Sequence, residues 1–170
     1  NEDDKSRGCP LILRKGKTFL TVDDAVNSMV SARRNVKDRY DSYGTDVNMR
    51  VFRTSGGEPT IALDWILNAW RKIEDNGLPF IGQLDTNLST GPLVDEFERQ
   101  GIYEKSILYK LSKYPVKVLA AIKGIDDENI AENVQSTATL KTQLESIKMF
   151  LDAGFDVYFQ MYNAKPKGVK

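Results

Sequence analysis

The sequence contains no histidine and only one cysteine, Cys9. Histidine is the commonest general base and a usual zinc ligand, so its absence excludes Ser-His-Asp and Cys-His catalytic arrangements and the usual zinc sites. A single cysteine excludes an internal disulfide and favours a reducing compartment, so we expect a cytoplasmic protein. The chemistry must therefore come from carboxylates, lysines or a bound cofactor, or its key residues lie elsewhere.

Net charge and long apolar runs are also lacking. The 24 Lys and Arg residues balance the 24 Asp and Glu residues, so we expect no broad basic surface and no nucleic-acid partner. No apolar stretch approaches the roughly 18 residues of a membrane span, and no signal-peptide pattern opens the chain. With 170 residues, 41% of them hydrophobic and 28% charged, the composition is typical of an ordinary globular protein. We predict a single domain over residues 1–170.

The stretch Met49–Thr60 organises the rest of the sequence. Its first half, Met-Arg-Val-Phe-Arg-Thr, has the β-branched and aromatic residues of a buried strand. Its second half, Ser-Gly-Gly-Glu-Pro-Thr, has two glycines, which adopt backbone angles that other residues avoid, and a proline suited to the first turn of a helix. The predicted strand, glycine loop and helix form the geometry that places ligand sites at the carboxyl ends of strands.

The charge of Glu58 limits the ligands that this loop can hold. Backbone N–H groups at a helix N-terminus can cradle a phosphate, but a carboxylate in the loop repels a phosphate and no lysine follows it. Backbone carbonyls and a carboxylate suit an ammonium group better. A strand-to-helix turn that needs glycine and carries a solvated glutamate accounts for the same residues equally well.

Helices and strands alternate along the chain. The spacing of apolar residues predicts helices at 22–37, 61–75, 92–100, 103–114 and 139–153, one or two helical turns at 126–133, and strands at 49–54, 79–84, 116–122 and 155–162. On the last helix we expect Leu140, Leu144, Ile147 and Leu151 to face the core. The strand at 116–122 is almost continuously apolar, as expected for a strand covered on both faces.

This alternation predicts an α/β fold whose strands are parallel and neighbour one another in chain order, joined by right-handed crossovers. Four strands cannot close a barrel, so the sheet is either small and open or part of a larger barrel. The polar opening at 1–6 without an initiator methionine, and the lysine-rich tail after the last strand, favour the second interpretation.

With this order in place, the stretch Thr54–Thr60 resembles the Gly-Gly-Glu motif that follows the second strand in radical S-adenosylmethionine (radical SAM) enzymes. Asp85-Thr86-Asn87 is similar to the Glu-Thr-Asn-Gly that ends the third strand in many members, with Leu88 in place of the glycine. Ala-Ile-Lys-Gly at 121–124 resembles the end of the fourth strand in activating-enzyme-like members, and Thr-Phe-Leu-Thr at 18–21 is also similar to the family. The resemblance covers nearly the whole chain. It implies strands two to five of a partial (β/α) barrel, incomplete at both ends.

One departure from the family is large. The Cys-x-x-x-Cys-x-x-Cys loop, whose three thiolates hold a [4Fe–4S] cluster, is absent, and the Gly-Cys-Pro setting of Cys9 does not match it. We expect the cluster ligands upstream of Asn1. The alternative is a member of the family that has lost its cluster.

The resemblance also assigns cofactor contacts. Gly56, Gly57 and Glu58, with Ser55 in the same loop, would hold the ammonium group of S-adenosylmethionine. Lys123 would face its carboxylate or ribose, Asp85 and Asn87 would offer hydrogen bonds on the same rim, and Gln160 would approach the adenine. A snorkelling surface lysine at position 123 and a plain turn at 85–87 are the alternatives. We assign no catalytic or metal-ligating residue within the chain.

The implied activity is that of a radical SAM enzyme. In such enzymes the cluster donates an electron to S-adenosylmethionine, and the resulting 5′-deoxyadenosyl radical abstracts hydrogen from a substrate. A reductant such as flavodoxin or ferredoxin and a small-molecule or protein substrate are implied as partners, and this chain alone is expected to be inactive. The second hypothesis is a cluster-less α/β domain that binds a small molecule or a partner protein without catalysis.

Overall fold

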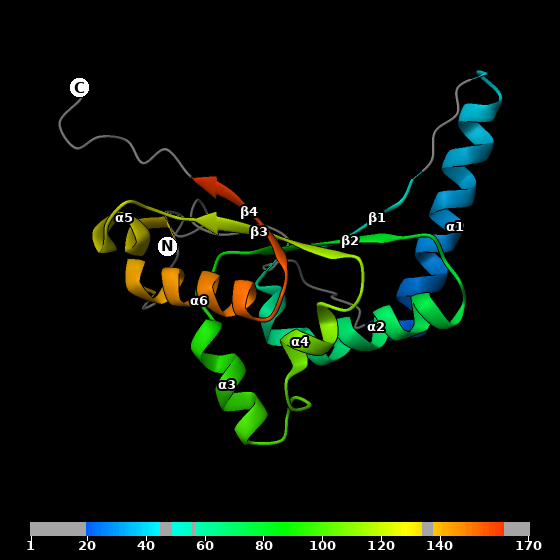
Figure 1. Ribbon diagram of the computed structural model, residues 1–170. Helices are drawn as coiled ribbons and strands as arrows, with labels where there is room; N and C mark the ends of the chain where they lie inside the picture. Colours follow the sequence, from blue (N-terminus) through cyan, green and yellow to red (C-terminus); the bar gives the residue numbers. More distant parts are fainter. Residues whose placement is uncertain (1–19, 45–48, 56, 134–137, 162–170) are drawn as a thin grey trace, which may run out of the picture.

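The computed structural model describes residues 20–44, 49–55, 57–133 and 138–161. In these ranges helices and strands alternate as predicted (Figure 1). The elements are α1 (Val22–Asp41), β1 (Val51–Thr54), the 3₁₀ helix η2 (Pro59–Ala62), α2 (Leu63–Asp75), β2 (Ile81–Thr86), α3 (Gly91–Arg99), α4 (Ile107–Leu111), β3 (Val116–Ile122), α5 (Asp127–Asn133), α6 (Leu140–Asp152) and β4 (Asp156–Met161).

The strands form one sheet in the order β1-β2-β3-β4, and every neighbouring pair is parallel. This confirms the predicted α/β class and the predicted strand order. Strand β2 runs two residues further than expected, so Asp85 and Thr86 are strand residues rather than a turn. Because all four strands run in the same direction, their carboxyl ends lie on one rim of the sheet.

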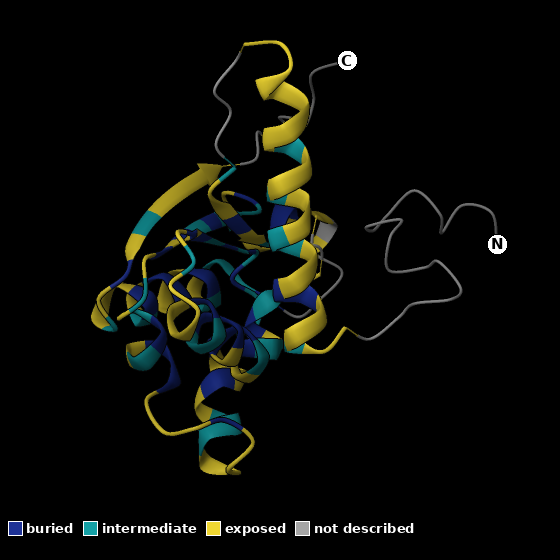
Figure 2. Cartoon of the chain, turned by 90° about the vertical axis from the view of Figure 1, so that its right-hand side faces the viewer, coloured by how far each residue is buried: buried dark blue, intermediate teal, exposed yellow. Residues whose placement is uncertain are grey.

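Helix α1 precedes the sheet and begins at a capping box. The Thr21 hydroxyl accepts a hydrogen bond from the Asp24 backbone N–H (3.1 Å), and the Asp24 carboxylate receives the Thr21 backbone N–H (3.4 Å). The helix continues to Asp41, four residues beyond its predicted end, where Lys37 and Asp41 form an ion pair one turn apart. Its buried residues, Ala25 and Val26, lie in its first half, and Figure 2 shows its second half almost entirely exposed.

Helices cover one face of the sheet. Figure 1 shows α2, α4 and α6 on the same side of the strands. The strand side chains that point to this side are buried, among them Phe52, Leu84 and Val118. Trp70 of α2 packs against Phe52 with ring centroids 5.8 Å apart. The hydrophobic core therefore lies between the sheet and this single layer of helices.

The other face is open, which corrects the prediction that β3 is covered on both faces. Along β3, Val116, Val118 and Ala120 are buried, whereas Lys117 is exposed and Leu119 only half-buried. In the ranges that the structure describes, no helix lies over this second side of the strands. Because most residues of β3 are apolar, the sequence hardly shows that buried and exposed positions alternate along this strand. Lys117 is the one charged residue that marks the exposed side.

Two helices differ from their predicted form. Helix α4 covers only 107–111 rather than 103–114, because Ser106 has a left-handed backbone (φ 57°) and Glu98 accepts the N–H groups of Ser106 and Ile107. Helix α6 is rotated relative to the prediction: Leu144 and Leu151 are 53% and 51% exposed. The buried positions are Gln143, Ser146, Ile147 and Phe150. No helix in the described ranges is long and apolar enough to cross a membrane.

Candidate functional site

The loop after β1 turns at Gly57. Its backbone φ of 111° is a conformation that residues other than glycine rarely adopt. Gly56, the other predicted glycine, lies outside the described residues. Glu58 follows with an extended backbone and forms the N-cap of η2, and Pro59 occupies its first turn. The glycine loop and the proline therefore do locally what the sequence indicates: they turn the chain from β1 into a helix.

The Glu58 carboxylate joins this loop to the carboxyl end of β2. Its Oε1 accepts hydrogen bonds from the Thr86 hydroxyl (2.7 Å), the Thr60 hydroxyl (2.8 Å) and the Thr60 backbone N–H (3.3 Å). Its Oε2 accepts the backbone N–H of Asn87 (2.8 Å). Glu58 is therefore half-buried and hydrogen-bonded within the chain rather than fully solvated. It is a clasp between two neighbouring strand ends, and this brings two of the predicted site residues, Glu58 and Asn87, into direct contact.

Asp85 lies on the open face of β2, inside a small polar cluster. Its Oδ2 accepts a hydrogen bond from Arg53 Nε (2.5 Å), and its Oδ1 accepts one from Gln83 Nε2 (2.7 Å). Arg53 belongs to β1 and stands in register with Gln83. The negative charge of Asp85 is thus matched by the neighbouring guanidinium.

Lys123 follows directly after β3 and is joined to Asn87 through a residue that the sequence did not indicate. Gln143 of α6 donates from Nε2 to the Asn87 carbonyl (2.7 Å) and accepts the Lys123 backbone N–H at Oε1 (3.3 Å). The Lys123 carbonyl accepts a further bond from Asn133 Nδ2 of α5 (2.7 Å). A glutamine among apolar positions at helical spacing is the one signal that could have identified Gln143, and it is a weak one.

Gln160 lies apart from these residues. It stands opposite Ala121 on β4, the edge strand furthest from the glycine loop, and it is exposed on the open face. Its face is shared with Tyr158, whose hydroxyl accepts a hydrogen bond from Lys117 Nζ (3.0 Å). The structure therefore gathers the ends of β1, β2 and β3, and leaves Gln160 at the far edge of the same sheet.

A pocket of about 550 Å³ lies beside the glycine loop, between α1, the end of β1 and the start of α2. Ser55, Gly57 and Glu58 line it on one side, and apolar side chains including Met29 and Trp65 line it on the other. Trp65 Nε1 donates a hydrogen bond to the Leu20 carbonyl (3.2 Å), which holds the indole at the pocket wall. This pocket combines a carboxylate, a glycine turn and an aromatic wall.

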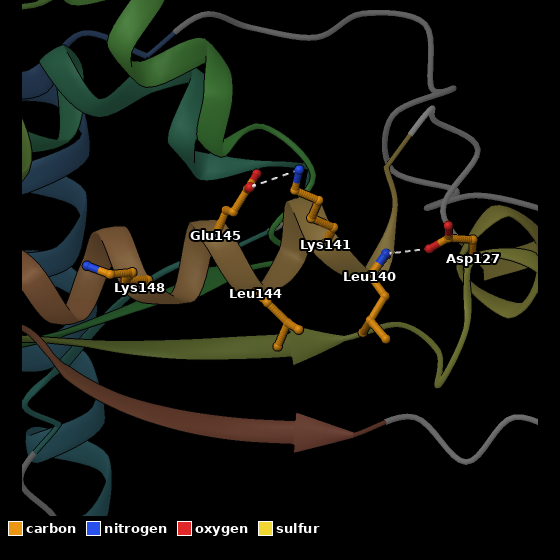
Figure 3. A pocket seen from close by; sticks show the side chains of 6 residues that line it. All are labelled: Asp127, Leu140, Lys141, Leu144, Glu145 and Lys148. Atoms are coloured by element: carbon orange, nitrogen blue, oxygen red, sulfur yellow. Dashed lines mark hydrogen bonds and ion pairs between the residues drawn. The ribbon is translucent and has the colours of Figure 1, made fainter.

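A second pocket, of about 580 Å³, lies on the outer surface of α6 (Figure 3). Leu140 and Leu144 project from one side of the helix, Lys141 pairs with Glu145, and the Leu140 backbone N–H donates to Asp127 (2.7 Å). None of the predicted site residues lines this pocket, and its charged groups are exposed, so it is the weaker candidate for a binding site.

Metal binding finds no support in the part of the chain that the structure describes, which holds no group of three or more Cys, His, Asp or Glu side chains placed to bind an ion. Cys9 lies outside the described residues.

Comparison with known proteins finds a distant likeness in structure. No protein-family model matches the sequence, and no curated protein matches it either. Among solved structures, the chain is similar to a crystal structure of a radical SAM methyltransferase from Sphaerobacter thermophilus, with 13% sequence identity and a TM-score of 0.35. The similarity covers 84% of this chain and 58% of that protein, so the chain spans little more than half of its length.

Proposed function

We propose that this chain is the S-adenosylmethionine-binding part of a radical SAM enzyme of the activating-enzyme-like group. The observation that carries the proposal is the contact between Glu58 and Asn87, which joins the glycine loop of β1 to the end of β2 beside a pocket of about 550 Å³. In open α/β sheets, ligands bind at the carboxyl ends of the strands, and two of the predicted residues, Glu58 and Asn87, are in contact there.

The free acceptor capacity of Glu58 supports an ammonium ligand. A carboxylate offers about four acceptor positions, two on each oxygen. Among the residues that the structure describes, Thr60 and Thr86 donate three hydrogen bonds to Oε1, whereas Oε2 receives the Asn87 N–H alone and keeps a position for a further donor. A cation at this position also offsets the charge of a half-buried carboxylate.

The other assigned contacts remain part of the proposal. Ser55 and Gly57 line the pocket beside Glu58, while Lys123 lies on the same rim for the carboxylate or ribose. Asp85 and Gln160 face the open side of the sheet, so they would meet parts of the ligand that extend over that face. The unknown small-molecule or protein substrate, and a reductant such as flavodoxin or ferredoxin, are proposed for the whole enzyme.

The residues of this chain do not fit a [4Fe–4S] cluster. Such clusters are held by several cysteine thiolates, and the chain has one cysteine and no histidine. We therefore derive no step of the reaction from a cluster, and the proposal for this chain is restricted to binding S-adenosylmethionine.

The hydrogen bonds that Glu58 makes within the chain favour a second candidate function. Its carboxylate accepts four hydrogen bonds from Thr60, Thr86 and Asn87, and the charge of Asp85 is paired with that of Arg53. Both observations suit an α/β domain that binds a small molecule or a partner protein without catalysis.

Calorimetric titration of the full chain with S-adenosylmethionine tests the first proposal. Replacing Glu58 with Gln removes the charge-assisted bond to the ammonium, and we expect affinity to fall about tenfold to over a hundredfold. Glu58→Gln also disturbs the clasp, because its amide NH₂ faces N–H and O–H donors. Thr86→Val is the matched control, since it keeps the carboxylate and removes one of its hydrogen bonds, together with the bond that the Thr86 hydroxyl accepts from the Leu88 N–H (2.9 Å).

We expect the affinity of Thr86→Val to stay within about threefold of wild type, because the ligand's own hydrogen bond is intact. Equal loss in both variants would show that Glu58 acts only as a clasp. A wild-type chain that binds no S-adenosylmethionine would overturn the proposal and favour the second candidate.

A further inference from the structure

Gln143 is a polar side chain with no exposed surface, on a helix whose other buried positions form part of the core. Buried amides are stable only when their hydrogen bonds are satisfied. Both halves of the Gln143 amide have partners, and the partners lie on two different strand ends: Asn87 after β2 and Lys123 after β3.

The Asn87 residue is therefore held from two sides. Its backbone N–H donates to Glu58 Oε2 (2.8 Å), and its carbonyl accepts from Gln143 Nε2 (2.7 Å). Through Gln143 Oε1 the same line of hydrogen bonds reaches the Lys123 N–H (3.3 Å). One continuous path of side-chain hydrogen bonds thus joins the ends of β1, β2 and β3, and Gln143 forms its link between the second and third.

Helix α6 is fixed where this link requires it. Ser146, one turn after Gln143, shares its hydroxyl proton between the Leu88 carbonyl (3.0 Å) and the Thr142 carbonyl of its own helix (2.8 Å). Gly91 at the start of α3 lies so close that a Cβ there would overlap the Ser146 side chain. The helix cannot withdraw from the loop between β2 and α3 without breaking these contacts, so the Gln143 amide stays within reach of both strand ends.

We propose that Gln143 is a positioning residue that couples the loop after β2 to the loop after β3, so that Asn87 and Lys123 adopt their positions together. Movement of either loop leaves a buried amide group without a partner, which makes independent movement of the two loops costly. The part that concerns the cofactor rests on the proposed function, because it takes Asn87 and Lys123 as cofactor contacts. The coupling itself does not depend on it.

Backbone hydrogen exchange of the full chain, measured residue by residue by NMR without any ligand, tests the coupling. Gln143→Met keeps the side-chain length and removes both hydrogen bonds. We expect the exchange rates of the Lys123 and Asn87 amides to rise about tenfold or more, while amides in α2 keep their wild-type rates.

Ser146→Ala on the same helix is the matched control, since it removes the hydroxyl that bonds the carbonyls of Leu88 and Thr142 and leaves both hydrogen bonds of Gln143 in place. Because the close packing of Gly91 against α6 remains and still holds the helix, we expect Ser146→Ala to change exchange at 88–91 and to leave the Lys123 amide unchanged. Unaltered exchange of Lys123 in Gln143→Met, or an equal rise in Ser146→Ala, would overturn the proposal.

If Gln143→Met loses its native circular dichroism, Gln143→Asn replaces it. Its side chain is one methylene shorter and cannot reach both loops, so protection should fall at one or both amides, and unchanged protection at both would again overturn the coupling.

Titration with S-adenosylmethionine separates the two proposals. Where the wild type binds, we expect Gln143→Met to bind about tenfold more weakly and Ser146→Ala to bind within about threefold of wild type. Equal affinity in wild type and Gln143→Met would overturn the cofactor part of the inference. A wild type that does not bind overturns the proposed function, and the exchange rates still decide whether Gln143 couples the loops.

Discussion

The two faces of the sheet are built by different means. On the covered face, Phe52, Leu84 and Val118 pack against helices and carry no polar group. On the open face, Arg53, Gln83, Lys117 and Asp156 stand in register in one row across the four strands. One face is stabilised by removing apolar surface from water, the other by pairing charges that remain near water.

Alternate residues of the same strand therefore have different roles: one set packs in the core and the other pairs charges on the open face. Arg53 pairs with Asp85, and Lys117 contacts Asp156 (3.4 Å) and Tyr158 (3.0 Å), so the charges of the open face are matched within it. Because this face is polar, it buries less apolar surface than a face covered by helices. Its polar side chains form a surface on which polar ligands can bind. We therefore expect stability to depend on the covered face, and binding to depend on the open face and its rim.

The largest effect should come from the covered face of β2. Leu84→Ala removes a fully buried side chain and leaves a cavity, which should lower the free energy of unfolding by about 2–5 kcal/mol. Gln83→Ala, the preceding residue on the open face, is the matched control and should cost less than about 1 kcal/mol. Urea denaturation of both variants checks this. Equal losses would mean that the two faces do not differ as described.

The next largest effect concerns Gly82, where Trp70 of α2 lies against the strand. A Cβ at this position would lie 2.5 Å from Trp70 Cζ2 and 2.8 Å from Val116 Cγ2, so Gly82→Ala overpacks the core. We expect a loss of about 1–3 kcal/mol. A Trp70→Leu background removes the overlap with the indole and leaves only that with Val116, so the further cost of Gly82→Ala should shrink. A cost that is the same in both backgrounds would show that Trp70 is not the obstacle.

Most of the fold could be predicted because its signals are local. The glycine at 57, the proline at 59 and the capping threonine at 21 each act within a few residues, and alternation of helices with strands then leaves few topologies. The second face of the sheet could not be predicted in the same way. Leu119 and Ala121 read as core residues, and only the position of the helices shows that they are not covered.

The site was predictable to a lesser extent, because its links are long-range. Glu58 stands out next to two glycines, yet its partners Thr86 and Asn87 are 28 and 29 residues away in the chain. Gln143 is 56 residues from Asn87, and its neighbours Leu140 and Leu144 suggested a different buried face of α6. Helix spacing identifies which residues share a face, but the apolar face need not be the one that docks when hydrogen bonds fix the rotation.

A smaller effect distinguishes two ion pairs of the open face. The Asp85 side chain is 14% exposed, whereas Asp156 is 72% exposed. Arg53→Met should therefore cost about 1 kcal/mol at neutral pH, because a largely buried carboxylate loses its cation. Lys117→Met should cost less than about 0.5 kcal/mol, because water screens the Asp156 charge. Denaturation at low and high salt checks both values. A larger loss for Lys117→Met would contradict the ranking.

A similarly small effect comes from Glu104, on the helix side of the molecule. Hydrogen bonds from Arg71 (2.6 and 2.9 Å) and then from Lys110 (2.7 Å) lower the pKa of Glu104 to about 2, from 4.5. A carboxyl group with a lowered pKa in the folded state contributes stability above pH 4.5, and this contribution is lost as the pH falls towards 2. The side chain is 42% exposed, so screening by water restricts the contribution to about 0.5 kcal/mol. Glu104→Gln should thus be less stable than wild type at pH 7 and equally stable near pH 2, as measured by urea denaturation at both values. A difference that persists at low pH would show that Glu104 contributes through packing rather than through its charge.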